Sequence, residues 1–185
     1  MLHLKNIQND WTLFLDRDGV INHEKQNDYI HTWEEFTFYD GVLEAMAIFA
    51  KKFKRIIIVT NQKGVGKGLT KETDLILIHK NMQAAIENAN GKIDGIYYCK
   101  DLEDDSPNRK PQPGMGLQAA KDFADIQLNK AIMVGNTLSD MKFGRNLGVK
   151  TVFLPTTRPE VNLQDEHIDA VYNSLIDFAN AIKHT

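Results

Sequence analysis

The chain has very little cysteine and no long hydrophobic run. Its one cysteine, Cys99, excludes an internal disulfide, and there is no Cys/His set that could ligate a structural zinc ion. No apolar run approaches the ~20 residues of a membrane span, and residues 1–10 lack the apolar core of a signal peptide. We therefore expect a cytoplasmic protein with no membrane partner.

The chain also lacks an excess of either charge. Its 22 Lys and Arg residues nearly balance 25 Asp and Glu residues, for a net charge of -3, so nothing points to a nucleic-acid partner. An apolar content of 42% is typical of globular proteins, and 185 residues suit one domain with a sizeable core. Without a repeat or linker, residues 1–185 are predicted to form a single domain, as a monomer or small homo-oligomer.

Strand-like and helix-like segments alternate along the sequence. Buried strands are predicted at 12–15, 55–60, 93–99, 130–135 and 150–154. Helices are predicted after Asp40, over 70–90, 114–123 and 139–147, and over most of 170–182, with Asp40 and Thr70 as N-caps. This alternation predicts an α/β fold, a doubly wound parallel sheet with helices on both faces.

Two segments between these elements are irregular. Residues 34–39 alternate enough to predict a short edge strand or hairpin arm. Neither 20–39 nor 100–113 is long enough for a separate domain over the sheet. We therefore expect no large cap domain and a rather open site.

The most informative stretch runs from Trp11 to Asn22. An apolar run stops abruptly at Asp16 and Asp18, which Gly19 follows. Open α/β sheets place their chemistry at the carboxyl ends of the strands. Two carboxylates there suit a hard cation and a covalent phosphoryl acceptor. The alternative is a polar turn that only closes the strand.

Other predicted strands also end in polar side chains. They supply Thr60 and Asn61 after the second strand, Asn136 and Asp140 after the fourth, and Arg109 and Lys110 in the loop between. Acids for a cation, a hydroxyl and an amide for phosphate oxygens, and a fixed cation together favour a phosphoryl-transfer site. The glycine-rich loop 64–68 matches neither a dinucleotide-binding motif nor a P-loop.

These motifs, in this order, resemble the haloacid dehalogenase superfamily of phosphohydrolases. Within it, the chain is most similar to small phosphatases that act on heptose bisphosphate and histidinol phosphate. The resemblance covers residues 11 to 154. It is carried by Leu13 to Asn22, by Val59 to Gln62 with Gly64 and Gly68, by Arg109 to Met115, and by Val134 to Asn136 with Ser139 to Met141.

The resemblance implies a role for each site residue. Asp16 is the implied nucleophile that forms an aspartyl-phosphate, and Asp18 the general acid and base. Lys110 steadies the nucleophile and the phosphoryl group, and Thr60 belongs with these catalytic residues. Substrate binding falls to Gly19, Asn61 and Arg109. Mg²⁺ is the implied cofactor, with Asp16, Asp18, Asn136 and Asp140 as its site.

These implications predict a Mg²⁺-dependent phosphatase that hydrolyses a small phosphorylated metabolite. Heptose 1,7-bisphosphate ranks ahead of histidinol phosphate as the expected substrate. A rival hypothesis is a catalytically weak member that binds a phosphorylated metabolite, and its support is Asn136.

The zinc loop of many relatives is missing here. Those relatives carry cysteines and a histidine ahead of the Arg-Lys-Pro motif. In this chain Cys99 stands where the first cysteine would be, but residues 100–108 contain no further Cys and no His. Tetrahedral zinc takes about four such ligands. The sequence therefore predicts no structural zinc.

Asn136 stands where the family normally has a magnesium-binding aspartate. An amide oxygen can ligate Mg²⁺, but it supplies a dipole in place of a full charge. We expect the Asn136→Asp variant to reach half-saturation at a lower Mg²⁺ concentration than the wild type. Titration of Mg²⁺ into both proteins measures this, and equal half-saturation would contradict it.

Overall fold

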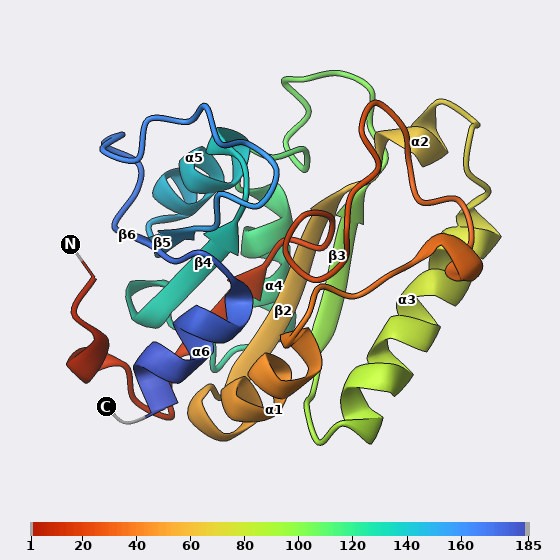
Figure 1. Ribbon diagram of the computed structural model, residues 1–185. Helices are drawn as coiled ribbons and strands as arrows, with labels where there is room; N and C mark the ends of the chain where they lie inside the picture. Colours follow the sequence, from red (N-terminus) through yellow and green to blue (C-terminus); the bar gives the residue numbers. More distant parts are fainter. Residues whose placement is uncertain (1, 184–185) are drawn as a thin grey trace.

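One parallel sheet organises the fold. The computed structural model describes residues 2–183; Met1, His184 and Thr185, which the single-domain prediction includes, lie outside the described residues. The sheet has the order β3-β2-β1-β4-β5-β6, and all its strands are parallel (Figure 1). The strands are β1 (Thr12–Leu15), β2 (Arg55–Asn61), β3 (Gly95–Cys99), β4 (Ala131–Gly135), β5 (Lys150–Phe153) and β6 (Ala170–Val171).

Helices cover both faces of this sheet. They are α1 (Val42–Lys52), α2 (Lys63–Gly66), α3 (Glu72–Asn88), α4 (Gly114–Asp122), α5 (Leu138–Leu147) and α6 (Leu175–Lys183), with short 3-10 turns at Leu4–Asn6, Trp33–Glu35 and Leu128–Lys130. Successive side chains of a strand point to opposite faces. Leu13 and Leu15 thus pack in the core under α1, α3 and α6, while Phe14 packs in the core under α4 and α5. The predicted doubly wound fold is confirmed.

The connections at the carboxyl edge of the sheet are short. Within residues 2–183, neither the segment after β1 nor the loop after β3 forms a separate cap domain. No helix of this described part combines the length and apolar character needed to cross a membrane.

The predicted edge strand at residues 34–39 is wrong. Trp33–Glu35 forms a 3-10 turn, and Phe38 makes only an isolated antiparallel bridge with Asn22. The apolar residues of this segment pack on one another: the Trp33 and Phe36 rings stack at 5.0 Å, and Phe36 meets Phe38 edge-on at 5.1 Å. The alternation of apolar and polar residues in this segment therefore corresponds to a small aromatic cluster and not to a strand.

Both predicted N-caps are wrong. Helix α1 begins after Gly41, which has a positive φ of 76°, and no side chain caps it. Helix α3 follows Lys71, again without a side-chain cap. The Thr70 hydroxyl is instead 2.7 Å from Nδ1 of His31, a contact between segments far apart in sequence. Propensity alone could not choose between a local cap and this tertiary contact.

The end of the chain also differs from the prediction of helix over most of 170–182. Ala170–Val171 forms the edge strand β6 against Val152 and Phe153, and α6 starts only at Leu175. Two residues are too few to show a period of two.

Asp169 anchors this edge strand. Its buried carboxylate accepts hydrogen bonds from the Arg145 guanidinium at 2.9 Å and from the backbone N–H of Thr151 at 3.0 Å. Burial by itself would raise the pKa of Asp169, but these hydrogen bonds outweigh it and lower the pKa to about 2.

We expect Asp169→Asn to lower the free energy of unfolding by about 1–3 kcal/mol at neutral pH. Because the folded-state pKa lies below the ordinary value of 3.8, the wild-type advantage is present above that value. It is lost as pH falls from there toward about 2. Urea unfolding of both proteins over a pH series measures this. Equal stability of the two proteins at neutral pH would contradict it.

Candidate active site

The candidate site lies where the winding of the sheet reverses. Strands β1 and β4 are neighbours at the centre of the sheet, and the chain leads outward from them in opposite directions. Ligands of such folds bind at this point, beyond the carboxyl ends of the strands. A cavity of about 420 Å³ opens there and is lined by Asp16, Asp18, Glu24, Thr60, Asn61, Asp104, Arg109, Lys110, Pro111, Asn136, Thr137, Ser139 and Asp140. Every predicted site residue except Gly19 lines it.

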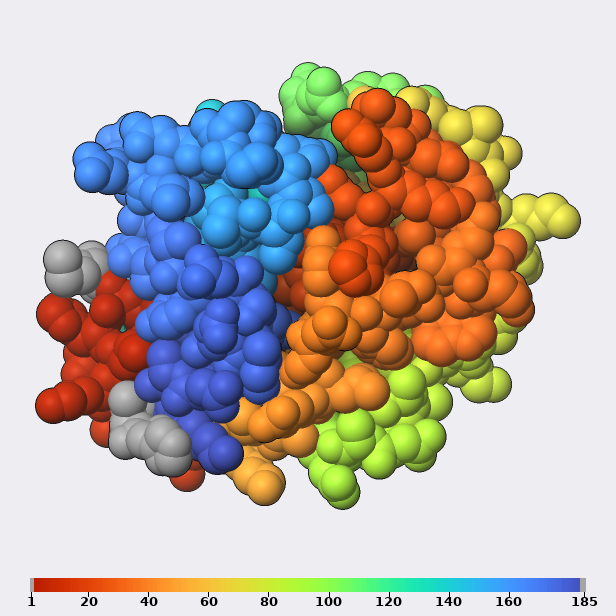
Figure 2. Space-filling view, in the orientation of Figure 1, coloured from red at the N-terminus to blue at the C-terminus, as the bar shows by residue number. Residues whose placement is uncertain are grey.

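The loops after the strands gather around this edge. Figure 2 shows the segment after β5 lying beside the segment after β1, with the loop after β3 at the same end of the molecule. A second cavity of about 730 Å³ shares Asp18, Glu24 and Asn61 with the first and continues between the first two of these segments. The site is thus an open depression formed by loops.

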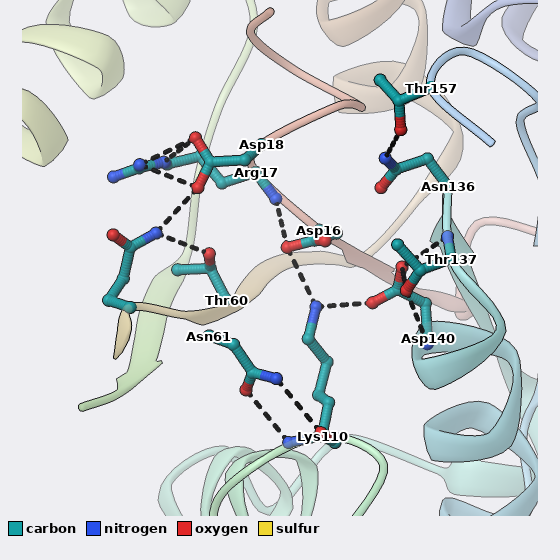
Figure 3. Close-up of polar contacts among 11 residues, drawn as sticks. Asp16, Arg17, Asp18, Thr60, Asn61, Lys110, Asn136, Thr137, Asp140 and Thr157 are labelled. Carbon is teal, nitrogen blue, oxygen red and sulfur yellow. Dashed lines mark hydrogen bonds and ion pairs between the residues drawn. The ribbon is translucent and has the colours of Figure 1, made fainter. Parts of the chain in front are cut away.

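Lys110 joins two carboxylates at the centre of the site (Figure 3). Its Nζ lies 2.9 Å from Oδ1 of Asp16 and 2.6 Å from Oδ1 of Asp140. The side chains of Lys110 and Asp140 are almost fully buried. Oδ1 of Asp16 also accepts the backbone N–H of Arg17 at 2.7 Å. Among the described residues, no donor holds Oδ2 of Asp16, which leaves that oxygen available to react.

These contacts shift the protonation of both partners. Burial, reinforced by the negative charge of Asp140 and opposed by Lys110, raises the pKa of Asp16 to about 7. Burial disfavours the ammonium of Lys110, but the carboxylates of Asp140 and Asp16 outweigh it and raise the pKa of Lys110. Lys110 is therefore charged at neutral pH, and a second cation beside Asp16 would favour the ionised form of Asp16.

Asp140 is held on both sides. Besides Lys110, it accepts from the backbone N–H of Thr137 at 3.0 Å and from the Thr137 hydroxyl at 2.7 Å, both on Oδ2. Thr137 and Asp140 form a capping box at the start of α5. Asp140 thus orients Lys110, and both of its oxygens already have donors.

Asp18 faces away from Asp16 in this structure. Its carboxylate is bound by the Arg17 guanidinium, with Nη2 at 2.8 Å from both oxygens (Figure 3). Arg17 is fully buried, and its Nη1 donates to Nε2 of His79 at 3.2 Å. Burial lowers the pKa of His79 to about 3, with the Arg17 charge in support, so the ring is neutral.

Two amides complete the shell around Asp18. Asn22 donates to Oδ1 at 2.9 Å, and Gln62 donates to Oδ2 at 2.8 Å and to the Thr60 hydroxyl oxygen at 2.9 Å. Burial would raise the pKa of Asp18, but Arg17 and these amides lower it. Asp18 is therefore ionised as it stands, and acting as an acid requires its carboxyl to leave Arg17.

Asn61 positions Lys110 from the other side. Its amide oxygen accepts the backbone N–H of Lys110 at 3.0 Å, and its Nδ2 donates to the Lys110 carbonyl at 3.1 Å. This pairs the end of β2 with the loop that carries the lysine. Nδ2 of Asn61 carries a second N–H, so the predicted contact of the amide with phosphate is compatible with these bonds.

Asn136 presents an unused oxygen to the site. Its side chain is fully buried, its Nδ2 donates to the Thr157 hydroxyl at 2.6 Å, and its Oδ1 has no partner among the described residues. In Figure 3 that oxygen lies on the Asp16 side of the amide. A buried acceptor without a donor, beside a carboxylate, fits a hard cation.

Gly19 makes room for this amide. Its φ is 82°, and a Cβ there would lie only 2.0 Å from Nδ2 of Asn136. Its carbonyl accepts from the Thr156 hydroxyl at 2.5 Å. The position therefore requires glycine for close packing against Asn136. The predicted contact of Gly19 with substrate would be a second role of this residue.

Arg109 stands at the mouth of the site. Its Nε donates to Oδ1 of Asp104 at 3.2 Å, and Lys63 lies 3.4 Å from the same oxygen. Nη1 of Arg109 is buried without a partner among the described residues. Asp104, from the loop after β3, thus lies between two cations at the entrance.

Sequence reasoning missed the supporting shell of Arg17, Asn22, Gln62, His79, Thr137 and Thr157. Three of these residues, Arg17, Asn22 and Gln62, lie within the motifs that carry the family resemblance. Their place in those motifs was the signal that could have identified them. His79 and Thr157 lie far from them in sequence and could be found only in three dimensions.

Comparison with known proteins finds relatives along nearly the whole chain. Residues 9–154 match the family described as polynucleotide kinase 3 phosphatase. The D-glycero-alpha-D-manno-heptose-1,7-bisphosphate 7-phosphatase of Mycobacterium bovis is 33% identical over 175 residues, which cover 94% of this chain and 92% of that protein. The D-glycero-beta-D-manno-heptose-1,7-bisphosphate 7-phosphatase of Escherichia coli K12 is 35% identical over 181 residues, 92% of this chain and 93% of that protein.

Solved structures agree. The crystal structure of D,D-heptose 1,7-bisphosphate phosphatase from B. bronchiseptica, complexed with magnesium and phosphate, has a TM-score of 0.84 at 27% identity and covers 94% of this chain and 98% of that one. The corresponding enzyme of Burkholderia thailandensis has a TM-score of 0.69 at 26% identity and covers 95% and 99%. The chain is therefore a phosphatase of the haloacid dehalogenase superfamily, and it belongs to the family that contains the heptose-1,7-bisphosphate phosphatases.

Proposed function

We propose that this phosphatase hydrolyses a heptose 1,7-bisphosphate with Mg²⁺ as cofactor and Asp16 as nucleophile. The observation that carries the proposal is the arrangement at Asp16, which lines the cavity: Oδ1 is fixed by Lys110 and a backbone N–H, while Oδ2 has no donor among the described residues. This fixes a nucleophile with its cation already in place.

Mg²⁺ would be held by Asp16, the Oδ1 of Asn136 and the carbonyl of Asp18. Bound there, the ion would offset the repulsion between the Asp16 carboxylate and the phosphate dianion. The unpartnered oxygen of Asn136 supports this ligand set. Asp140 contributes its charge through Lys110, since Lys110 and Thr137 occupy both of its oxygens.

The reaction would proceed in two displacements. In the first, Oδ2 of Asp16 bonds to phosphorus, the bond from phosphorus to the ester oxygen breaks, and Asp18 gives its proton to the leaving oxygen. In the second, water attacks the same phosphorus and gives a proton to Asp18, while the bond to Asp16 breaks and phosphate leaves. Lys110 would stabilise the charge on the phosphoryl oxygens, with the Thr60 hydroxyl as a further donor.

Asp18 has to turn for these proton transfers. In the structure its carboxylate is bound to Arg17, Asn22 and Gln62. We propose that substrate binding draws the protonated form of Asp18 toward the scissile ester oxygen.

The relatives support a sugar bisphosphate as the substrate. Proteins named for the alpha and for the beta anomer match at 33% and 35% identity, so both anomers are candidates. Arg109 and Lys63 at the entrance offer two cations for the phosphate that is not cleaved. We keep the cytoplasmic location, the monomeric or small homo-oligomeric state and the lack of structural zinc as predictions.

We expect phosphate release from a heptose 1,7-bisphosphate that depends on Mg²⁺ and disappears in Asp16→Asn. The panel should hold both anomers, histidinol phosphate, a chromogenic ester and a 3′-phosphorylated oligonucleotide, each with and without Mg²⁺. Faster turnover of histidinol phosphate or of the oligonucleotide would replace the proposed substrate. No turnover of any ester by folded protein would favour the binding role.

Arg109→Ala tests the distal contact. We expect kcat/KM for the bisphosphate to fall about ten-fold to a hundred-fold, the cost of losing a charged hydrogen bond. The chromogenic monophosphate, which has no second phosphate, serves as the internal control and should be hydrolysed at nearly the wild-type rate. An equal loss on both esters would mean that Arg109 acts at the reacting phosphate or in the fold.

A further inference from the structure

Asn136 differs from an aspartate at this position in one physical respect besides charge. A carboxylate can offer either oxygen to a cation, whereas an amide has one ligating end and one end that repels a cation. An asparagine ligand therefore needs a partner that holds its nitrogen away from the metal. Outer-shell partners of this kind orient ligands in many metal sites.

Thr157 stands where such a partner is required. Its hydroxyl oxygen lies 2.6 Å from Nδ2 of Asn136, and this bond leaves Oδ1 as the free, buried end. Nδ2 is also pressed against Gly19, where even a Cβ would not fit. A Cβ at Gly19 would lie 2.0 Å from Nδ2 and 3.0 Å from Oδ1, so the nitrogen end packs closest to Gly19 and is bonded to Thr157. The oxygen end lies on the Asp16 side of the amide (Figure 3).

The segment that carries Thr157 is itself held in place. The backbone N–H of Leu154 donates to the carbonyl of Gly135 at 2.9 Å, at the end of β4. The Thr156 hydroxyl donates to the carbonyl of Gly19, and Arg158 donates to Glu24 at 2.7 Å. These anchors, on both sides of Thr157, connect the segment after β5 to the end of β4 and to the segment after β1.

We propose that Thr157 is a positioning residue for the metal site: it fixes the amide of Asn136 with Oδ1 toward Asp16, so that a neutral side chain can serve as a magnesium ligand. The proposal rests on the proposed Mg²⁺ dependence of the enzyme. It assigns to the segment after β5 a part in metal binding that no sequence motif of the site indicates.

The test is isothermal titration of Mg²⁺ into metal-stripped protein, which does not depend on activity. We expect Thr157→Val, which keeps the shape and removes the hydroxyl, to raise the Kd for Mg²⁺ about ten-fold or more. Thr157→Ser keeps the hydroxyl and should retain most of the affinity. Thr73→Val, at an exposed position of α3, is the matched control and should bind as the wild type does.

A second background isolates the orientation effect. In Asn136→Asp, either oxygen can face the ion, so adding Thr157→Val should change the Kd about two-fold or less. Equal losses in both backgrounds would overturn the proposal, because they would assign Thr157 a role independent of the amide. Thermal melts in the absence of Mg²⁺ should show all these variants folded.

The outcomes separate this proposal from the proposed function. If the wild type hydrolyses esters but its Kd for Mg²⁺ equals that of Thr157→Val, Thr157 has no positioning role. The proposed enzymatic function would then still stand. A higher KM with an unchanged Kd for Mg²⁺ would make Thr157 a substrate contact instead. A wild type that neither binds Mg²⁺ nor depends on it would refute the metal-dependent function itself.

Discussion

The ion pairs of one buried lysine hold this site together. Lys110 lies between Asp16, the residue after β1, and Asp140, at the start of α5. A buried cation is costly unless it is paired and hydrogen-bonded. Here each partner is also fixed by others: Asp16 by a backbone N–H, Asp140 by Thr137, and the lysine backbone by Asn61. Removing one member would leave the others as uncompensated buried charges.

A second buried cation, Arg17, binds the carboxylate of Asp18. Arg17 holds Asp18 away from the nucleophile and is itself packed against the neutral His79. The two acids, two residues apart in sequence, therefore have pKa values shifted in opposite directions. Burial raises the pKa of Asp16, while Arg17 and two amides lower that of Asp18. Environment thus distinguishes two identical side chains, as in other enzymes with paired acids.

Two loops contact the residues around this centre. The segment after β5 contacts Gly19, Glu24 and Asn136, and the acidic loop after β3 places Asp104 between Lys63 and Arg109. Since the described chain has no cap domain over the site, these short segments are the parts of the protein that can meet the rest of a substrate.

The sequence by itself determined the sheet and the place of the chemistry. The strand at residues 56–60 shows as a continuous β-branched run. The carboxyl ends of parallel strands must share one edge, so Asp16, Thr60, Lys110 and Asn136 could be brought together without coordinates. Only the tertiary structure decided the short elements and the side-chain orientations. Strand β6 has only two residues, too few for a sequence pattern. The Thr70 hydroxyl contacts His31 and does not cap a helix. The orientation of Asp18 and the amide of Asn136 depends on Arg17, His79 and Thr157, which meet through contacts that neither spacing nor propensity encodes.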